Sequence, residues 1–165
     1  MQHVQIRSTT SALVLTAVLI ALATLFTMYT KIPVPGIRGY FNVGDVVIMT
    51  SALLLGRKYG AYIGAIGPAL ADLFLGYAVF VPITFVVKGI EGYLVGTVYN
   101  NKTTTSALAA TIVGGIIIVA GYFIVEYFVF NPGVAIASIL TNTIQAVMSV
   151  IVSMILYAIL RKRLR

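Results

Sequence analysis

Long apolar runs, separated by short polar or helix-breaking segments, make up most of this chain. The first run covers residues 11–29 and stops before Lys31 and the segment Pro33-Val34-Pro35-Gly36, which cannot continue a helix. The second covers residues 43–55 and ends at Gly56-Arg57-Lys58. A spanning helix needs about 20 mostly apolar residues at a rise of about 1.5 Å each. The first run therefore predicts a full span, and the second predicts a marginal one.

Four further apolar runs follow. Residues 59–77 include Pro68, which we expect to kink the helix rather than end it, because apolar residues continue on both sides. The other three runs cover residues 81–99, 106–130 and 134–160, with polar turns between them. The pattern predicts an all-α membrane protein in which residues 1–165 form a single bundle of six transmembrane helices.

Composition supports a membrane protein and excludes several classes of function. Hydrophobic residues make up 60% of the chain and charged residues 9%, whereas roughly a quarter of residues are charged in soluble domains. With no cysteine and one histidine, thiolate and histidine metal clusters are excluded, and we expect neither a metal nor a cofactor. The net charge of +7 comes from basic clusters beside the apolar runs, so we expect no nucleic-acid partner.

The basic residues also predict an orientation. One side of the predicted bundle holds only Lys31 and Arg38. The other side holds eight basic residues: Arg7, Arg57, Lys58, Lys102, Arg161, Lys162, Arg163 and Arg165. Because basic loops stay inside, both termini are expected in the cytoplasm. The loop of residues 31–42 then faces outward, and its aromatic residues Tyr40 and Phe41 are expected to cover a binding site and stack on a flat ligand.

Ionisable side chains lie inside the apolar runs in the middle of the chain. Asp45, Asp72, Lys88 and Glu91 are expensive to place in hydrocarbon, so they indicate a functional site. They can form a polar pocket under the outer loop, or Asp72 and Lys88 can form a buried ion pair that locks two helices. Asp45 can also be favoured simply because it begins a helix. Glu91 lacks an obvious partner and is the better ligand candidate.

The last two runs add further polar residues near the same level. Tyr122 and Glu126 are four apart, and Asn142 and Gln145 are three apart, so each pair shares a helix face. Amides in hydrocarbon either hydrogen-bond a neighbouring helix or bind a ligand's ring nitrogens and hydroxyls, and Glu126 can instead be solvated at the membrane surface. The predicted substrate-binding residues are Tyr40, Phe41, Asn42, Lys88, Glu91, Tyr122, Glu126, Asn142 and Gln145.

Small residues four apart recur in three of the predicted helices. Ala17 and Ala21 in the first helix allow another helix to approach closely, either a partner's or one of this bundle. Gly60 with Gly64 and Gly92 with Gly96 have the same spacing, and there we expect packing within the bundle.

With these features, the chain resembles the substrate-binding S components of energy-coupling factor (ECF) vitamin transporters. The resemblance is strongest through FNVGDVVIMTSALLLGRKYGAYIGAIGPALADLFLGY and VPITFVVKGIEGYLVG, which are similar to the subgroup with riboflavin, hydroxymethylpyrimidine and pyridoxine-type S components. It implies a non-enzymatic binding subunit of the prokaryotic plasma membrane. Such a subunit captures a vitamin or precursor outside, joins a membrane coupling subunit and two cytoplasmic ATPases, and tips over to release the solute inside.

The resemblance also implies where binding occurs. The first external loop would cover a site built from the fourth, fifth and sixth helices, and Ala17 and Ala21 would face the coupling subunit. The Asn-Val-Gly-Asp sequence after Phe41 differs from the Ser-Asp-Val-Pro type of riboflavin binders, which favours hydroxymethylpyrimidine or pyridoxine. Two other functions stay open: a self-sufficient oligomeric transporter or channel, and, ranked last, an intramembrane enzyme with acid–base carboxylates.

Overall fold

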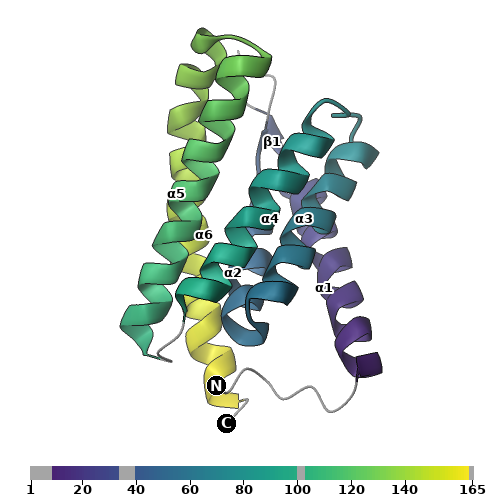
Figure 1. Cartoon of the computed structure of the whole chain (residues 1–165), viewed down its shortest axis with the longest axis vertical. Coiled ribbons are helices and arrows are strands. Elements are labelled where there is room, and N and C mark those ends of the chain that lie inside the picture. Colours follow the sequence, from purple (N-terminus) through teal and green to yellow (C-terminus); the bar gives the residue numbers. More distant parts are fainter. Residues whose placement is uncertain (1–8, 34–39, 100–102, 164–165) are drawn as a thin grey trace.

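The computed structural model describes residues 9–33, 40–99 and 103–163, and these form six helices and a two-stranded ribbon (Figure 1). In chain order the elements are α1 (Thr9–Tyr29), β1 (Ile32–Pro33), β2 (Tyr40–Phe41), α2 (Gly44–Leu55), α3 (Arg57–Phe74), α4 (Phe80–Val98), α5 (Thr104–Val129) and α6 (Pro132–Arg163). All six predicted helices are present, with each end within three residues of its predicted position. Pro68 lies inside α3, which continues on both sides of it.

Four of the helices, α1, α4, α5 and α6, are long and apolar enough to cross a membrane. At 12 residues, α2 rises only about 18 Å, short of the ~30 Å hydrocarbon core. The 18 residues of α3 include Arg57, Lys58 and Asp72, which lower its hydropathy. The structure thus confirms an all-α membrane protein, with four helices that meet the requirements of a full span.

The short helix α2 lies at the centre of the bundle. It contacts all five other helices, and each of its residues except Leu54 is buried. A helix that is apolar on all sides is stable only when other elements surround it. This central position carries Asp45, in the first turn of α2, into the protein interior.

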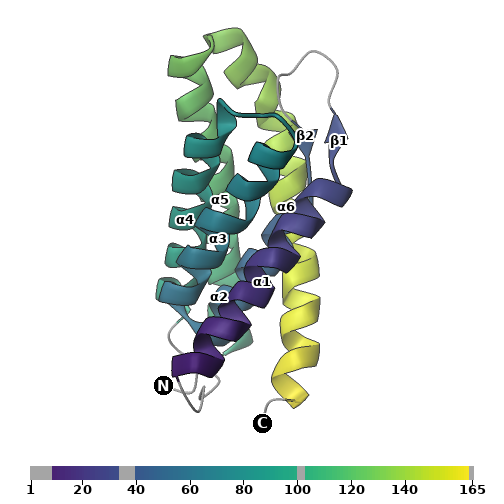
Figure 2. The same cartoon turned by 90° about the vertical axis from the view of Figure 1, so that its right-hand side faces the viewer.

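The two ends of the bundle differ. The start of α1 and the end of α6 lie at one end, which we call the terminal end (Figure 1). The ribbon of β1 and β2 follows α1 near the other end, which we call the ribbon end, and lies beside α6 (Figure 2). The strands pair antiparallel, with Ile32 opposite Phe41. The sequence indicated only a loop here.

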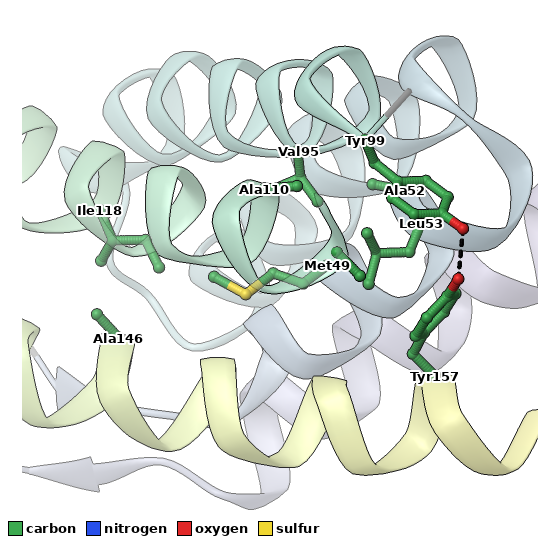
Figure 3. Close-up of a cluster of buried hydrophobic side chains, with 10 residues drawn as sticks. Met49, Ala52, Leu53, Val95, Tyr99, Ala110, Ile118, Ala146 and Tyr157 are labelled. Carbon is green, nitrogen blue, oxygen red and sulfur yellow. Dashed lines mark hydrogen bonds between the residues drawn. The ribbon is translucent and has the colours of Figure 1, made fainter. Parts of the chain in front are cut away.

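Towards the terminal end, a cluster of apolar side chains fills the bundle. Met49 and Leu53 of α2 pack there against residues of α4, α5 and α6 (Figure 3). The cluster also contains Tyr99 and Tyr157, whose hydroxyl groups hydrogen-bond to each other. These two buried hydroxyl groups therefore satisfy each other, as burial requires.

Glycines bring α3 and α4 close together. A Cβ atom at Gly60 would lie only 2.6 Å from the carbonyl oxygen of Gly92, and one at Gly64 would overlap the carbonyl oxygen of Lys88. The prediction that these glycines pack within the bundle is confirmed. The close contact sets the position of α4 and hence of Lys88.

We expect Gly92→Ala to destabilise the fold, because its methyl group would overlap the Gly60 backbone and force α3 from α4. Overpacking of this kind costs about 1–3 kcal/mol or more. Unfolding in mixed detergent micelles measures the loss. Gly89→Ala on the same helix is the matched control, since its methyl group would lie 3.2 Å from the Cβ atom of Ala65 and no closer than 3.7 Å to any backbone atom of another helix. Equal losses in the two variants would contradict the close α3–α4 contact.

Candidate functional site

Three helices bring Asp45, Lys88 and Gln145 together in the interior. Lys88 of α4 is only 1% exposed, and its ammonium group forms an ion pair with Oδ1 of Asp45 on α2. Nε2 of Gln145 on α6 donates a hydrogen bond to the other oxygen, Oδ2, at 2.6 Å. Both oxygens of this buried carboxylate are thus paired, which is the condition for keeping a charge inside a bundle.

The same glutamine also holds the end of the first loop. Oε1 of Gln145 accepts a hydrogen bond from the backbone N–H of Asn42 at 3.1 Å. The Asn42 side chain accepts a hydrogen bond from the backbone N–H of Gly44 at 2.9 Å, which stabilises the turn between β2 and α2. Asn42 and Gln145 therefore tie the loop to α6. The backbone of Tyr40 and Phe41 forms β2, but their side chains, predicted to cover the ligand, lie outside the part that the structure describes.

The ion pair differs from the one considered in the sequence. We expected Lys88 to pair with Asp72 of α3 if the pair were structural, but its ion pairs run to Asp45 and Glu91. The reason is the central position of α2, which places Asp45 directly against α4. Asp72 is also buried, on α3.

Glu91 has polar capacity that the described residues do not use. It is fully buried, and its Oε2 lies 3.7 Å from the ammonium nitrogen of Lys88. Neither carboxylate oxygen accepts a hydrogen bond from the residues that the structure describes. The buried Nδ2 group of Asn142 likewise donates no hydrogen bond to them. A buried acceptor and a buried donor without partners are costly unless something else satisfies them.

Tyr122 of α5 contributes an aromatic surface to this cluster. The Lys88 ammonium nitrogen lies 5.4 Å from the centre of its ring, and its hydroxyl group hydrogen-bonds Oγ1 of Thr84 at 3.0 Å. Thr84 is a buried residue that the sequence analysis missed. Its position four residues before Lys88, on the same face of α4, could have revealed it.

Glu126 lies one helical turn beyond Tyr122 on α5. Its carboxylate accepts a hydrogen bond from the hydroxyl group of Ser138 on α6, and the residue is 3% exposed. The alternative that Glu126 is solvated at the membrane surface is therefore wrong. Ser138 was also missed, although it precedes Asn142 by four residues and so continues the polar face of α6.

The site combines acceptors, donors, one cation and an aromatic ring. The described residues include no group of three His, Cys, Asp or Glu side chains that could hold a metal ion. The combination of hydrogen-bonding groups, a cation and an aromatic ring suits the binding of a small polar molecule through hydrogen bonds and ring contacts. The predicted ligand roles of the individual side chains stay predictions.

Comparison with known proteins identifies the family. A family described as "ECF-type riboflavin transporter, S component" matches residues 7–162, which is almost the whole chain. The chain belongs to this family. The resemblance predicted from the sequence is thus confirmed, and the protein is a multi-pass S component of the prokaryotic cell membrane.

Individual relatives of this S component are similar over most of their length. A Pyrococcus woesei protein, described as "Uncharacterized protein in gap 3'region", is 41% identical over 144 residues, covering 86% of this chain and 95% of its own. The "Thiamine precursor transporter HmpT" of Lactococcus lactis subsp. cremoris (strain MG1363) is 29% identical over 164 residues, covering 98% and 92% respectively. A solved structure described as "Structure and mechanism of the S component of a bacterial ECF transporter" has the same fold, with a TM-score of 0.75, 20% identity, and coverage of 96% and 99%.

The two alanines of α1 that are four residues apart, Ala17 and Ala21, face away from the bundle. Ala17 and Ala21 of the S component are exposed, whereas Ala23, Thr24 and Thr27 of the same helix are buried against the bundle. Of the two alternatives left open by the sequence, packing of Ala17 and Ala21 within this bundle is therefore wrong. The surface they form is available to lipid or to a partner.

Proposed function

We propose that this S component is the substrate-binding subunit of an ATP-driven importer and captures a water-soluble vitamin precursor, of hydroxymethylpyrimidine or pyridoxine type, from outside. The observation that carries the proposal is that the Glu91 oxygens and the Asn142 amide nitrogen are buried without a hydrogen-bond partner among the described residues, whereas Asp45, Lys88 and Gln145 hold one another in place. The similarity to a thiamine precursor transporter supports the same class of substrate.

The chemistry of a hydroxymethylpyrimidine matches these groups. Its amino group donates hydrogen bonds that the Glu91 carboxylate can accept, and its ring nitrogens accept bonds that the Asn142 amide can donate. The Tyr122 ring offers a face for stacking, with Tyr40 and Phe41 of the loop as further candidates. Lys88 and Gln145 hold this arrangement through Asp45, and Asn42 is held by Gln145. Glu126 extends the polar surface along α5.

We further propose that all six helices traverse the membrane region and that both termini lie in the cytoplasm. The described Arg57, Lys58, Arg161 and Lys162 belong to helix ends at the terminal end, whereas Lys31 belongs to the ribbon end. This asymmetry supports the orientation, since basic segments stay inside. The ribbon end, with the site below it, would then face outward.

The importer would need a membrane coupling subunit and two ATPase subunits. Uptake of labelled hydroxymethylpyrimidine, in cells that cannot otherwise import it, tests this proposal when the S component is expressed with and without a coupling module. We expect uptake only with the module, and none when its ATPases are inactive. Uptake by the S component alone would support the alternative of a self-sufficient transporter.

We expect Ala17→Leu and Ala21→Leu to abolish uptake while leaving substrate affinity unchanged. Both residues are exposed, so a larger side chain is tolerated by the bundle but blocks close approach of a partner helix. Ala109→Leu, at an exposed alanine of α5, is the matched control and should retain uptake. Full uptake by the α1 variants would remove this surface from the coupling interface.

A further inference from the structure

The lipid-facing side of the helix pair α5 and α6 contains two neighbouring hollows. One is a cavity of about 350 Å³ at the terminal end, lined by Thr104 of α5 and by Met154, Tyr157, Ala158, Arg161 and Lys162 of α6. The other is a groove of about 560 Å³ farther along the same two helices, bordered by residues such as Val119 and Ala120 of α5 and Val147 and Val150 of α6. We call them the basic cavity and the apolar groove.

The two hollows share one face of α6. Thr143, Val147 and Val150 line the apolar groove. The next residues in the same three- and four-residue steps, Met154 and Ala158, line the basic cavity. Steps of three and four residues stay on one side of a helix, so the groove and the cavity follow one another along the same face of α6.

The chemistry changes along this path. All but one of the side chains that line the apolar groove are nonpolar, the exception being Thr143. The basic cavity is lined by two cations and no carboxylate, and the guanidinium group of Arg161 lies 5.7 Å from the centre of the Tyr157 ring. Thr104 is the first residue of α5, so the positive end of that helix also faces this region. The cavity therefore favours an anionic group, and the groove favours a hydrocarbon chain.

The dimensions fit the membrane. From Ile139 to Ile151 the groove follows α6 for about 18 Å, and its near end at Ile151 lies about 10 Å along the helix from Ala158 of the basic cavity, within reach of an acyl chain. With 26 residues, α5 is about 39 Å long, close to the ~40–45 Å of a bilayer including its headgroups, so Thr104 lies near headgroup level.

We propose that an anionic phospholipid binds along α5 and α6, with its phosphate in the basic cavity and an acyl chain in the apolar groove. The charge of the cavity, its depth at headgroup level and the apolar groove that follows it on the same face of α6 all support this occupant. The site lies outside the substrate cluster, and the proposal is independent of the substrate's identity.

Native mass spectrometry of the purified protein, after exchange into phosphatidylglycerol or phosphatidylcholine with identical acyl chains, tests this site. We expect phosphatidylglycerol to be retained about tenfold or more in preference to phosphatidylcholine. The double variant Arg161→Gln/Lys162→Gln should lose this preference. Arg57→Gln/Lys58→Gln is the matched control, because it removes an equal charge at the same end, including an arginine similarly placed over a tyrosine ring, and it should keep the preference.

A second variant separates lipid from other occupants. Ala120→Leu fills the apolar groove at an exposed position and should reduce retention of both lipids. Equal retention of the two lipids by the wild-type protein, or an equal loss in the control, would overturn the proposal. Complete displacement of phosphatidylglycerol by inorganic phosphate, together with lipid retention that Ala120→Leu does not change, would also overturn the proposal. That result would indicate a phosphate site. A wild-type dimer that Ala120→Leu dissociates, with lipid retention unchanged, would assign this face to a second copy of the chain.

Discussion

Replacing Lys88 by methionine will unfold much of the protein under conditions in which the wild type is stable. The substitution leaves the Asp45 carboxylate buried without its cation, and loss of one partner from a buried ion pair costs about 3–5 kcal/mol. The contact of the ammonium group with the Tyr122 ring is lost as well. Unfolding in mixed detergent micelles, followed by circular dichroism, measures the change.

The double variant Asp45→Asn/Lys88→Met is the control for this prediction. It removes both charges and keeps an amide oxygen that can accept the hydrogen bond from Gln145. We expect it to recover most of the lost stability, because a neutral pair has little desolvation cost. If the single variant is no less stable than the double variant, Asp45 and Lys88 do not form the ion pair described here.

Glu91→Gln will weaken substrate binding by about 10- to 150-fold, since a hydrogen bond to a charged group contributes about 1.5–3 kcal/mol. Stability should change little, because the Glu91 oxygens accept no hydrogen bond from the described residues and Lys88 keeps its closer ion pair with Asp45. Titration calorimetry with the precursor and an unfolding measurement give the two quantities separately.

Glu126→Gln provides the comparison for Glu91. It makes the same chemical change at a buried carboxylate that already accepts a hydrogen bond from Ser138, so we expect a smaller loss of affinity. Unchanged affinity in folded Glu91→Gln protein would remove Glu91 from the substrate site. Equal losses in both variants would indicate a general effect of charge rather than direct binding.

The helices could be predicted because their causes are local. Apolar runs and the polar turns between them act over a few residues, and the predicted ends are close to the observed ones. The packing role of Gly60 and Gly92 also followed from spacing alone. The short length of α2 was evident, but its central position was not, since a hydrophobic run does not indicate which neighbours surround it.

The candidate site was predicted as a set of residues rather than as a set of contacts. The order of helices around the bundle decides whether Lys88 meets Asp45 or Asp72, and no local pattern contains that order. The hydrogen bond between Asn42 and Gln145 joins residues 103 positions apart and depends on the same arrangement. Thr84 and Ser138, in contrast, lay on helix faces already identified and could have been found by extending them.

The most direct test of the central claim is a thermal-shift titration of the purified protein with hydroxymethylpyrimidine, pyridoxine, riboflavin and thiamine, together with mass spectrometry of the small molecules it releases. A ligand bound only by the folded state stabilises it by about 2.7 kcal/mol at 100 times its Kd. We predict a saturable rise in melting temperature with hydroxymethylpyrimidine or pyridoxine, and the same compound among the released molecules. No shift with any of the four compounds and no released vitamin would contradict the assignment of this cluster as a vitamin-precursor site.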